Sequence, residues 1–517
     1  MTDENSSHND KTPIKPPSLL DALVAILTLI ILLAAAVSLF GSDAITGPVQ
    51  IALILSAMVA MLIGLKNGHR WADMGRAAVE GIATAMGAIF ILLAVGALIG
   101  TWSMSGTIVT LVYYGVSILN PTWYYVACVI ICGLVALSIG SSWTVAATLG
   151  VSLIAVAGVI GVSPEITAGA VISGAYFGDK MSPLSETTNL APAVAGTDIF
   201  THIKNMVWTT LPSILIALVI FGFIGFTRPG AVVEFDVSRV LEILDSIFNI
   251  SFWTLLPLLA VLLMALRKMP AFPTVFVGAL LGGIMAVILQ PDIVLAFVNE
   301  PDLSQPVAMI KGIWSAMATG FALETGYASL DALISRGGMA SMLETVWLII
   351  SAMAFGGVLE NSGLLARLLQ PLLEKAKTAK SMLISVGLTA IGMNIIAGDQ
   401  YMAIVLPGKM FAAEFRKKGI APETLSRQIE DTATITSPLV PWNSCGAYMA
   451  ATLGIATFTY LPYCFFNLIN PLLSFIYDIA GFQIKRIKAE EPVPEPLTEG
   501  TFYGVGGQRV EPTTLGQ

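Results

Sequence analysis

Long apolar runs separated by short polar segments are the feature that most constrains this chain. Runs of about 17–25 apolar residues are long enough to cross a bilayer as an α-helix. Only 12% of the 517 residues are charged, which is too few to cover a soluble protein of this length. The sequence therefore predicts an all-α polytopic membrane protein. Its clearest runs cover residues 19–40, 48–65, 82–100, 106–120, 205–226, 252–266 and 272–289.

One polar stretch interrupts this pattern. Residues 178–189 read Gly-Asp-Lys-Met-Ser-Pro-Leu-Ser-Glu-Thr-Thr-Asn and lie between apolar segments. Pro183 breaks any helix that passes through it. A charged side chain near the bilayer centre costs at least about 2.5–3.5 kcal/mol, and a broken backbone there must be buried in protein or line a watery cavity. A stretch with both costs is most simply interpreted as a binding site.

The second half of the chain repeats the first at a nearly constant spacing. Gly398-Asp399-Gln400-Tyr401 follows Gly140-Ser141-Ser142-Trp143 by 258 residues. Ala421-Pro422-Glu423 follows Ser163-Pro164-Glu165 by the same distance. Around the second break the spacing shortens: Ser437 follows Ser182 by 255 residues and Asn443 follows Asn189 by 254. Paired turn residues over more than a hundred positions indicate a duplication.

The positions of the cationic residues predict that the two copies are inverted. Residues 106–120 have no Lys or Arg, whereas their counterpart 363–380 has Arg367, Lys375, Lys377 and Lys380. Since Lys and Arg collect in cytoplasmic loops, equivalent loops should face opposite sides. We therefore expect about ten transmembrane helices, two re-entrant hairpins around Gly140 and Gly398, broken helices, and both termini in the cytoplasm.

This topology divides the chain into four parts. We expect a cytoplasmic tail at 1–17, a first half at 18–250 with its repeat at about 71–226, a second half at 251–484 with its repeat at about 327–480, and a cytoplasmic tail at 485–517. Inverted repeats with broken helices that meet at the midplane are typical of secondary transporters.

With Ser335-Arg336-Gly337-Gly338-Met339 and Ala354-Phe355-Gly356-Gly357-Val358-Leu359-Glu360, the stretch at 178–189 resembles the NhaC family of sodium–proton antiporters over roughly residues 15–480. The resemblance implies two opposed re-entrant hairpins and coupling to Na⁺. Because the family also includes carriers that resemble malate–lactate exchangers and amino-acid transporters, it implies Na⁺ more firmly than any single substrate.

The candidate residues are acids and neutral oxygen donors near the breaks and hairpin tips. Asp179 and Glu186 flank Pro183, so we expect both to face one cavity. Na⁺ prefers hard oxygen ligands, and we predict a site at Asp179, Glu186 and Asn189. Lys180 is interpreted as a structural counter-charge to one of these acids, and Glu430 as a helix-terminal residue. The other candidates are Asp399 and Glu360 as cation- or proton-binding acids, and Ser182, Thr187, Ser141, Ser437 and Asn443 as supporting ligands.

The predicted activity is exchange of Na⁺ for H⁺ across a bacterial cytoplasmic membrane. Burial favours the neutral acid and bound Na⁺ favours the carboxylate, so the two ions exclude each other. The alternative is Na⁺- and H⁺-coupled transport of a small organic acid or amino acid, with Lys180 holding its carboxylate. No metalloprotease or serine-hydrolase motif appears, so we expect neither an enzyme nor a cofactor. The net charge of −8 does not suggest nucleic acid. Stoichiometry, ion selectivity and a homodimer stay open.

Overall fold

The computed structural model describes residues 14–227, 237–324, 331, 334–487, 502–503 and 509–510. Most of both predicted tails, part of the loop after residue 227, and part of the segment that precedes Met342 lie outside the described residues. The described chain is almost entirely helical, which confirms the predicted fold class. Its strands are β1 (Phe502–Tyr503) and β2 (Arg509–Val510), which pair antiparallel.

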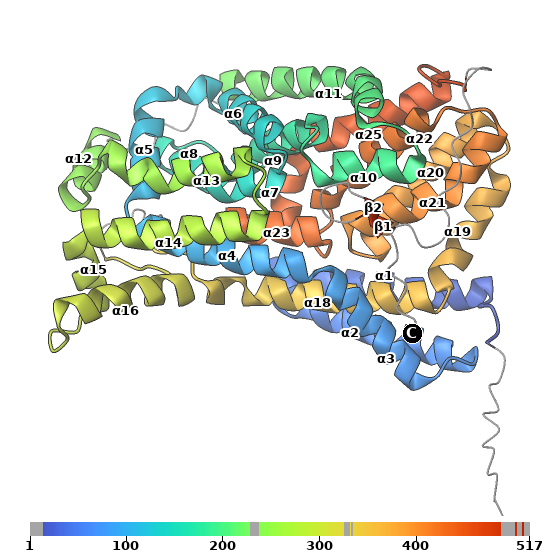
Figure 1. Ribbon diagram of the computed structural model, residues 1–517, viewed down its shortest axis with the longest axis horizontal. Helices are drawn as coiled ribbons and strands as arrows, with labels where there is room; N and C mark the ends of the chain where they lie inside the picture. The colour runs from blue at the N-terminus through green and yellow to red at the C-terminus, as the bar shows by residue number, and fades with distance from the viewer. Residues whose placement is uncertain are drawn as a thin grey trace, which may run out of the picture.

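The first half holds fifteen helical elements, shown from blue to green in Figure 1. They are α1 (Leu19–Phe40), η1 (Gly41–Thr46), α2 (Pro48–Lys66), α3 (Trp71–Thr84), α4 (Met86–Met104), α5 (Thr107–Ile118), η2 (Pro121–Trp123), α6 (Tyr124–Ile139), α7 (Ser142–Val145), the π-helix η3 (Ala146–Gly150), α8 (Val151–Ile160), α9 (Pro164–Met181), α10 (Glu186–Ala195), α11 (Ile199–Thr227) and α12 (Val237–Ile247).

The second half runs from green to red in Figure 1. Its elements are η4 (Phe252–Leu255), α13 (Leu256–Leu266), α14 (Ala271–Leu289), α15 (Pro291–Val298), α16 (Gln305–Ala318), η5 (Met339–Met342), α18 (Leu343–Asn361), α19 (Leu364–Lys375), α20 (Ala379–Ile396), α21 (Gln400–Lys417), α22 (Pro422–Ile429), the π-helix η6 (Glu430–Thr434), η7 (Ser437–Leu439), α23 (Ser444–Leu453), α24 (Thr457–Tyr460), η8 (Leu461–Tyr463) and α25 (Phe465–Ala480).

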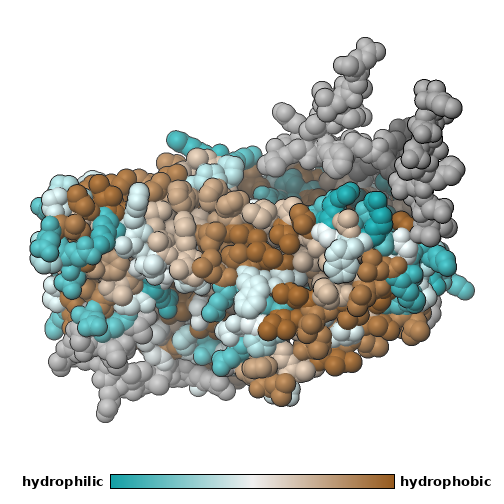
Figure 2. All heavy atoms as spheres, turned by 90° about the horizontal axis from the view of Figure 1, so that it is seen from below, coloured by the Kyte–Doolittle hydropathy of each residue, from teal (hydrophilic) through white to brown (hydrophobic). Residues whose placement is uncertain are grey.

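The described residues contain nine helices that are long and apolar enough to cross a membrane, or up to eleven if two bent pairs are each one span. The nine include the legs Pro121–Ile139 and Ser142–Ile160 on either side of Gly140. Figure 2 shows hydrophobic residues over much of the middle of one face, with hydrophilic residues gathered mainly toward its two ends. This distribution fits a protein whose middle is surrounded by lipid, and the chain is a multi-pass membrane protein.

The helices repeat at the spacing of the sequence. Helix α18 begins 257 residues after α4, and α21, α22 and α23 each begin 258 residues after α7, α9 and α10. The two halves also interlock, because α4 packs against α14 of the second half and α18 packs against α2 of the first (Figure 1). The paired helices α1–α2 and α13–α14 thus form a scaffold that holds each repeat from the opposite half of the chain.

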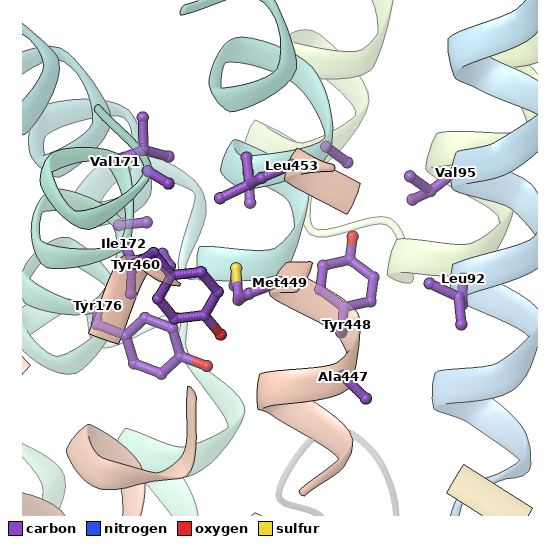
Figure 3. Close-up of a cluster of buried hydrophobic side chains, with 14 of the residues drawn as sticks. Leu92, Val95, Val171, Ile172, Tyr176, Ala447, Tyr448, Met449, Leu453 and Tyr460 are labelled. Carbon is purple, nitrogen blue, oxygen red and sulfur yellow. The ribbon is translucent and has the colours of Figure 1, made fainter. Parts of the chain in front are cut away.

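A buried apolar cluster joins the repeats at α23. Figure 3 shows Tyr448 and Ala447 of α23 on the side of Leu92 and Val95 of α4, while Met449 of α23 lies toward the side chains of α9. All five of these side chains are nearly or fully buried. The second half-helix of repeat two is therefore wedged between α4 and α9 of repeat one, which fixes the two breaks in the same region of the molecule.

Candidate functional site

The first broken helix lies where the sequence predicts it. Helix α9 ends at Met181 and α10 begins at Glu186, with Pro183 in the gap. The hydroxyl of Thr188 donates to the backbone carbonyls of Asp179 (3.2 Å) and Lys180 (3.1 Å). Both carbonyls lie in the last turn of α9, where α-helical partners are lost, and the Asp179 carbonyl also accepts from the Ser182 N–H. The backbone break is thus held by the polar stretch that causes it.

Asp179 connects this break to the tip of the first hairpin. The chain turns at Gly140, whose φ of +75° suits glycine, and Ser141 then caps the next helix through the Thr144 N–H. The Asp179 carboxylate accepts hydrogen bonds from the backbone N–H (3.1 Å) and the hydroxyl (2.7 Å) of Ser142, and the side chain is only 8% exposed. The structure therefore brings Asp179 and the hairpin tip together in the protein interior.

The second hairpin tip repeats this arrangement with different chemistry. After Gly398 (φ +66°), Asp399 caps α21 by accepting from the Met402 N–H, and the Ser444 hydroxyl lies 3.4 Å from its other oxygen. The Ser437 hydroxyl donates to the side-chain carbonyl of Gln400 at 2.7 Å. Asp399 and Ser437 thus lie together at the second break, although Asp399 also has a structural task as a cap.

The two caps of the second half-helices correct one detail of the sequence alignment. Asn443 caps α23 through the Cys445 N–H, as Ser185 caps α10 through the Thr188 N–H. Asn443 is therefore the counterpart of Ser185 at a spacing of 258 residues, and not of Asn189. The Asn189 side chain is exposed and donates to the carbonyls of Pro183 (3.0 Å) and Ser185 (2.6 Å).

Each hairpin also touches the other repeat. The Tyr401 hydroxyl of the second hairpin donates to the Glu186 carboxylate of α10 at 2.5 Å. At the equivalent place Trp143 of the first hairpin stacks on Tyr448 of α23, with ring centroids 3.9 Å apart. Tyr401 follows Trp143 by 258 residues. Reciprocal contacts of this kind are what a two-fold axis between inverted copies produces.

We expected Lys180 to neutralise Asp179 or Glu186, but it pairs with neither. It forms an ion pair with Asp431 of η6, and both side chains are fully buried. Asp431 also accepts from the hydroxyls of Thr209 (3.0 Å) and Ser474 (2.8 Å). The partners of Asp431 come from α9, α11 and α25, so this pair ties the first break to the second repeat.

Two further charged residues complete a buried network. Arg427 of α22 lies 3.9 Å from Asp431 and 3.8 Å from Asp478 of α25, and none of the three is exposed. Next to them Glu430 is also fully buried, and neither of its carboxylate oxygens has a hydrogen-bond partner. Glu430 does stand at a helix terminus, where α22 ends and η6 begins, but its carboxylate accepts no hydrogen bond there. The sequence does carry a signal for this network. Arg427 and Asp431 are oppositely charged, lie four residues apart, and fall in a repeat that is embedded in the membrane.

The other predicted residues divide into two groups. Ser182 and Thr187 are buried at the first break, where Thr187 lies 3.1 Å from the Ser185 hydroxyl. Glu186 is exposed at the start of α10 apart from its bond to Tyr401. Glu360 is exposed at the end of α18 and interacts electrostatically with Lys409. No hydrogen bond in the described part of the chain connects Glu360 to the other predicted residues.

Comparison with known proteins agrees with this architecture. The profile of the Na⁺/H⁺ antiporter family matches residues 174–482, and that of a C4-dicarboxylate anaerobic carrier family matches residues 1–227. The chain is 37% identical to the Na⁺/H⁺ antiporter NhaC of Alkalihalophilus pseudofirmus over 84% of this chain and 91% of that protein.

Two other relatives carry different names. The malate-2H⁺/Na⁺-lactate antiporter of Bacillus subtilis is 34% identical over 84% of this chain and 90% of its own length. The arginine/ornithine antiporter ArcD of Halobacterium salinarum is 31% identical over 95% of this chain and 98% of its own length. The profile of the Na⁺/H⁺ antiporter family matches more than half of this chain. The chain therefore belongs to the NhaC family of Na⁺/H⁺ antiporters.

Proposed function

We propose that this protein exchanges Na⁺ for H⁺ across the cytoplasmic membrane by alternating access, with both termini in the cytoplasm. Asp179 carries the proposal, because it is a buried carboxylate that bridges a broken helix and a hairpin tip. Membership of the NhaC family and 37% identity to an Na⁺/H⁺ antiporter support the same activity.

The exchange follows from competition at Asp179. A buried carboxylate is stable either as a neutral acid or with a cation beside it. Na⁺ and H⁺ therefore replace each other. Either ion neutralises the negative charge that an empty Asp179 carboxylate would leave inside the membrane. Alternating access requires the site to move relative to the scaffold α1–α2 and α13–α14, so that the ion meets water on one side at a time.

The test is Na⁺-driven proton movement in proteoliposomes that contain a pH-sensitive dye. We expect exchange by the wild-type protein, none by the double variant D179N/E186Q, and near wild-type exchange by E165Q. The control makes the same chemical change at the start of α9, where Glu165 accepts from Ser163 at 2.5 Å. Unchanged exchange by the double variant would exclude this mechanism.

A second candidate is coupled transport of a small organic acid or amino acid. The match to a dicarboxylate carrier family and the similarity to malate–lactate and arginine/ornithine antiporters favour it. Against it, Lys180 is fully buried and paired with Asp431, so it is not free to hold a substrate carboxylate. Uptake of labelled malate, lactate or arginine that disappears without Na⁺ would establish it, whereas Na⁺-driven proton movement that needs no organic solute supports simple exchange.

A further inference from the structure

Glu430 is fully buried, and the interactions around its carboxylate are weak. It begins the π-helix η6, is 0% exposed, and makes no hydrogen bond through either carboxylate oxygen. The charge of Lys180 favours its carboxylate and that of Asp179 opposes it, while the hydroxyls of Thr434 and Thr187 lie close enough to interact weakly with it. The Thr434 hydroxyl is itself buried without a hydrogen-bond partner. A carboxylate in such a place requires a compensating proton or cation.

The charges around Glu430 are already balanced without it. Lys180 and Asp431 form one buried pair, and Arg427 lies between Asp431 and Asp478. Two fixed cations thus meet two acids, and Glu430 adds a negative charge that no cation in this network matches. The remaining titratable groups nearby are engaged elsewhere: Asp179 with Ser142, Glu186 with Tyr401, and His202 of α11 with Ser426.

We propose that Glu430 is a proton-binding residue distinct from the Na⁺-binding carboxylate Asp179. This proposal rests on the proposed exchange of Na⁺ for H⁺. A proton fits better than Na⁺ because the neutral oxygen donors beside Glu430 are few: Na⁺ needs several oxygen ligands, whereas a proton needs only the carboxyl oxygen to which it binds.

The position of Glu430 also couples the two acids. When Asp179 is ionised and empty, its negative charge repels the Glu430 carboxylate, so Glu430 keeps its proton. Either ion on Asp179 cancels that repulsion, so Glu430 can release its own proton when the Na⁺-bound site opens to water. On departure of Na⁺ the proton is taken up again. No bond other than the carboxyl O–H forms or breaks.

The variant E430Q tests this inference, because glutamine keeps the shape of a protonated glutamate and cannot ionise. We expect the number of protons exchanged per Na⁺, read from the reversal potential in proteoliposomes, to fall by one while Na⁺ is still transported. The control is E423Q on the same helix, where Glu423 is partly exposed beside Lys485. It should keep the wild-type ratio.

A binding measurement keeps the test decisive if E430Q binds Na⁺ but does not complete a cycle. Calorimetric titration of the detergent-solubilised protein with Na⁺, in two buffers of different ionisation enthalpy, counts the protons released per Na⁺ bound. One proton fewer in E430Q supports the proposal, and the wild-type number overturns it. A raised KM for Na⁺ with an unchanged proton number would assign Glu430 to Na⁺ binding instead. Absence of exchange by the wild-type protein would overturn the proposed function itself.

Discussion

The two broken helices share a frame and differ in their chemistry. Pro164 begins α9 and Pro422 begins α22, 258 residues apart, and the same spacing separates Gly196 and Gly454 at the ends of the second half-helices. Within this frame the position 258 residues before Glu430 holds Ile172, part of the apolar cluster in Figure 3. Duplication has therefore preserved the spacing of this frame, while the buried charges occupy different positions in the two copies.

The shape of the helix differs at the same place. Helix α9 is regular to Met181, whereas α22 passes into the π-helix η6 at Glu430 and then into the short η7. Single π-turns inside helices are common at functional sites. The second break is also three residues closer to the start of its helix, because Pro438 follows Pro183 by only 255 residues. The two breaks thus are not interchangeable halves of one site.

The largest effect should come from the carboxylate that only the first break carries. D179N removes the charge that holds Na⁺ and leaves a side chain that still accepts from Ser142. We expect apparent Na⁺ affinity to fall at least about 100-fold, measured as Na⁺-dependent proton movement over a range of Na⁺ concentrations. A KM and maximal rate equal to those of the wild type would show that the first break is not the Na⁺ site.

The ion pair across the repeats should dominate stability. K180M leaves Asp431 buried without its cation, which costs about 3–5 kcal/mol. The double variant K180M/D431L removes both charges and should recover most of that loss, as seen in thermal unfolding of the detergent-solubilised protein. If K180M alone melts like the wild type, the repeats are not held together by this pair.

Local signals explain what the sequence predicts well and what it does not. Gly140, Gly398 and Pro183 fix turns and a break through their own backbone preferences, so these features need no partner. The partner of Lys180 lies 251 residues away and follows from packing alone. Helix α22 carries polar side chains on one face, a pattern typical of a surface helix, yet its residues from Thr424 to Ile429 are buried between repeats.

The hairpin tips offer a smaller and sharper comparison. D399S places at the second tip the residue type that caps the first, and serine caps a helix about as well as aspartate. We therefore expect unchanged thermal stability. Exchange should slow by about tenfold if the charge of Asp399 assists ion binding. This effect is modest beside that of D179N because the Asp399 carboxylate is already engaged as a helix cap by the Met402 N–H. Equal exchange rates for D399S and the wild type would show that Asp399 acts only as the cap of α21.

The smallest expected effect lies where the repeats differ only in a helix cap. Asp198 precedes α11 and accepts from the N–H groups of Thr201 (2.9 Å) and Phe200 (3.1 Å), whereas its counterpart Ala456 gives α24 no side-chain cap. D198A should lower the free energy of unfolding by about 1 kcal/mol, and A456D should raise it by a similar or smaller amount, both measured by thermal unfolding at pH 7.

Hydrogen bonds, chiefly from Thr201, lower the pKa of Asp198. Because the folded protein favours the carboxylate, its contribution is present above the unfolded pKa of about 3.9 and is lost as the pH falls through the lower folded value. A difference between D198A and wild type that grows on acidification would contradict the cap, since the two proteins should converge there.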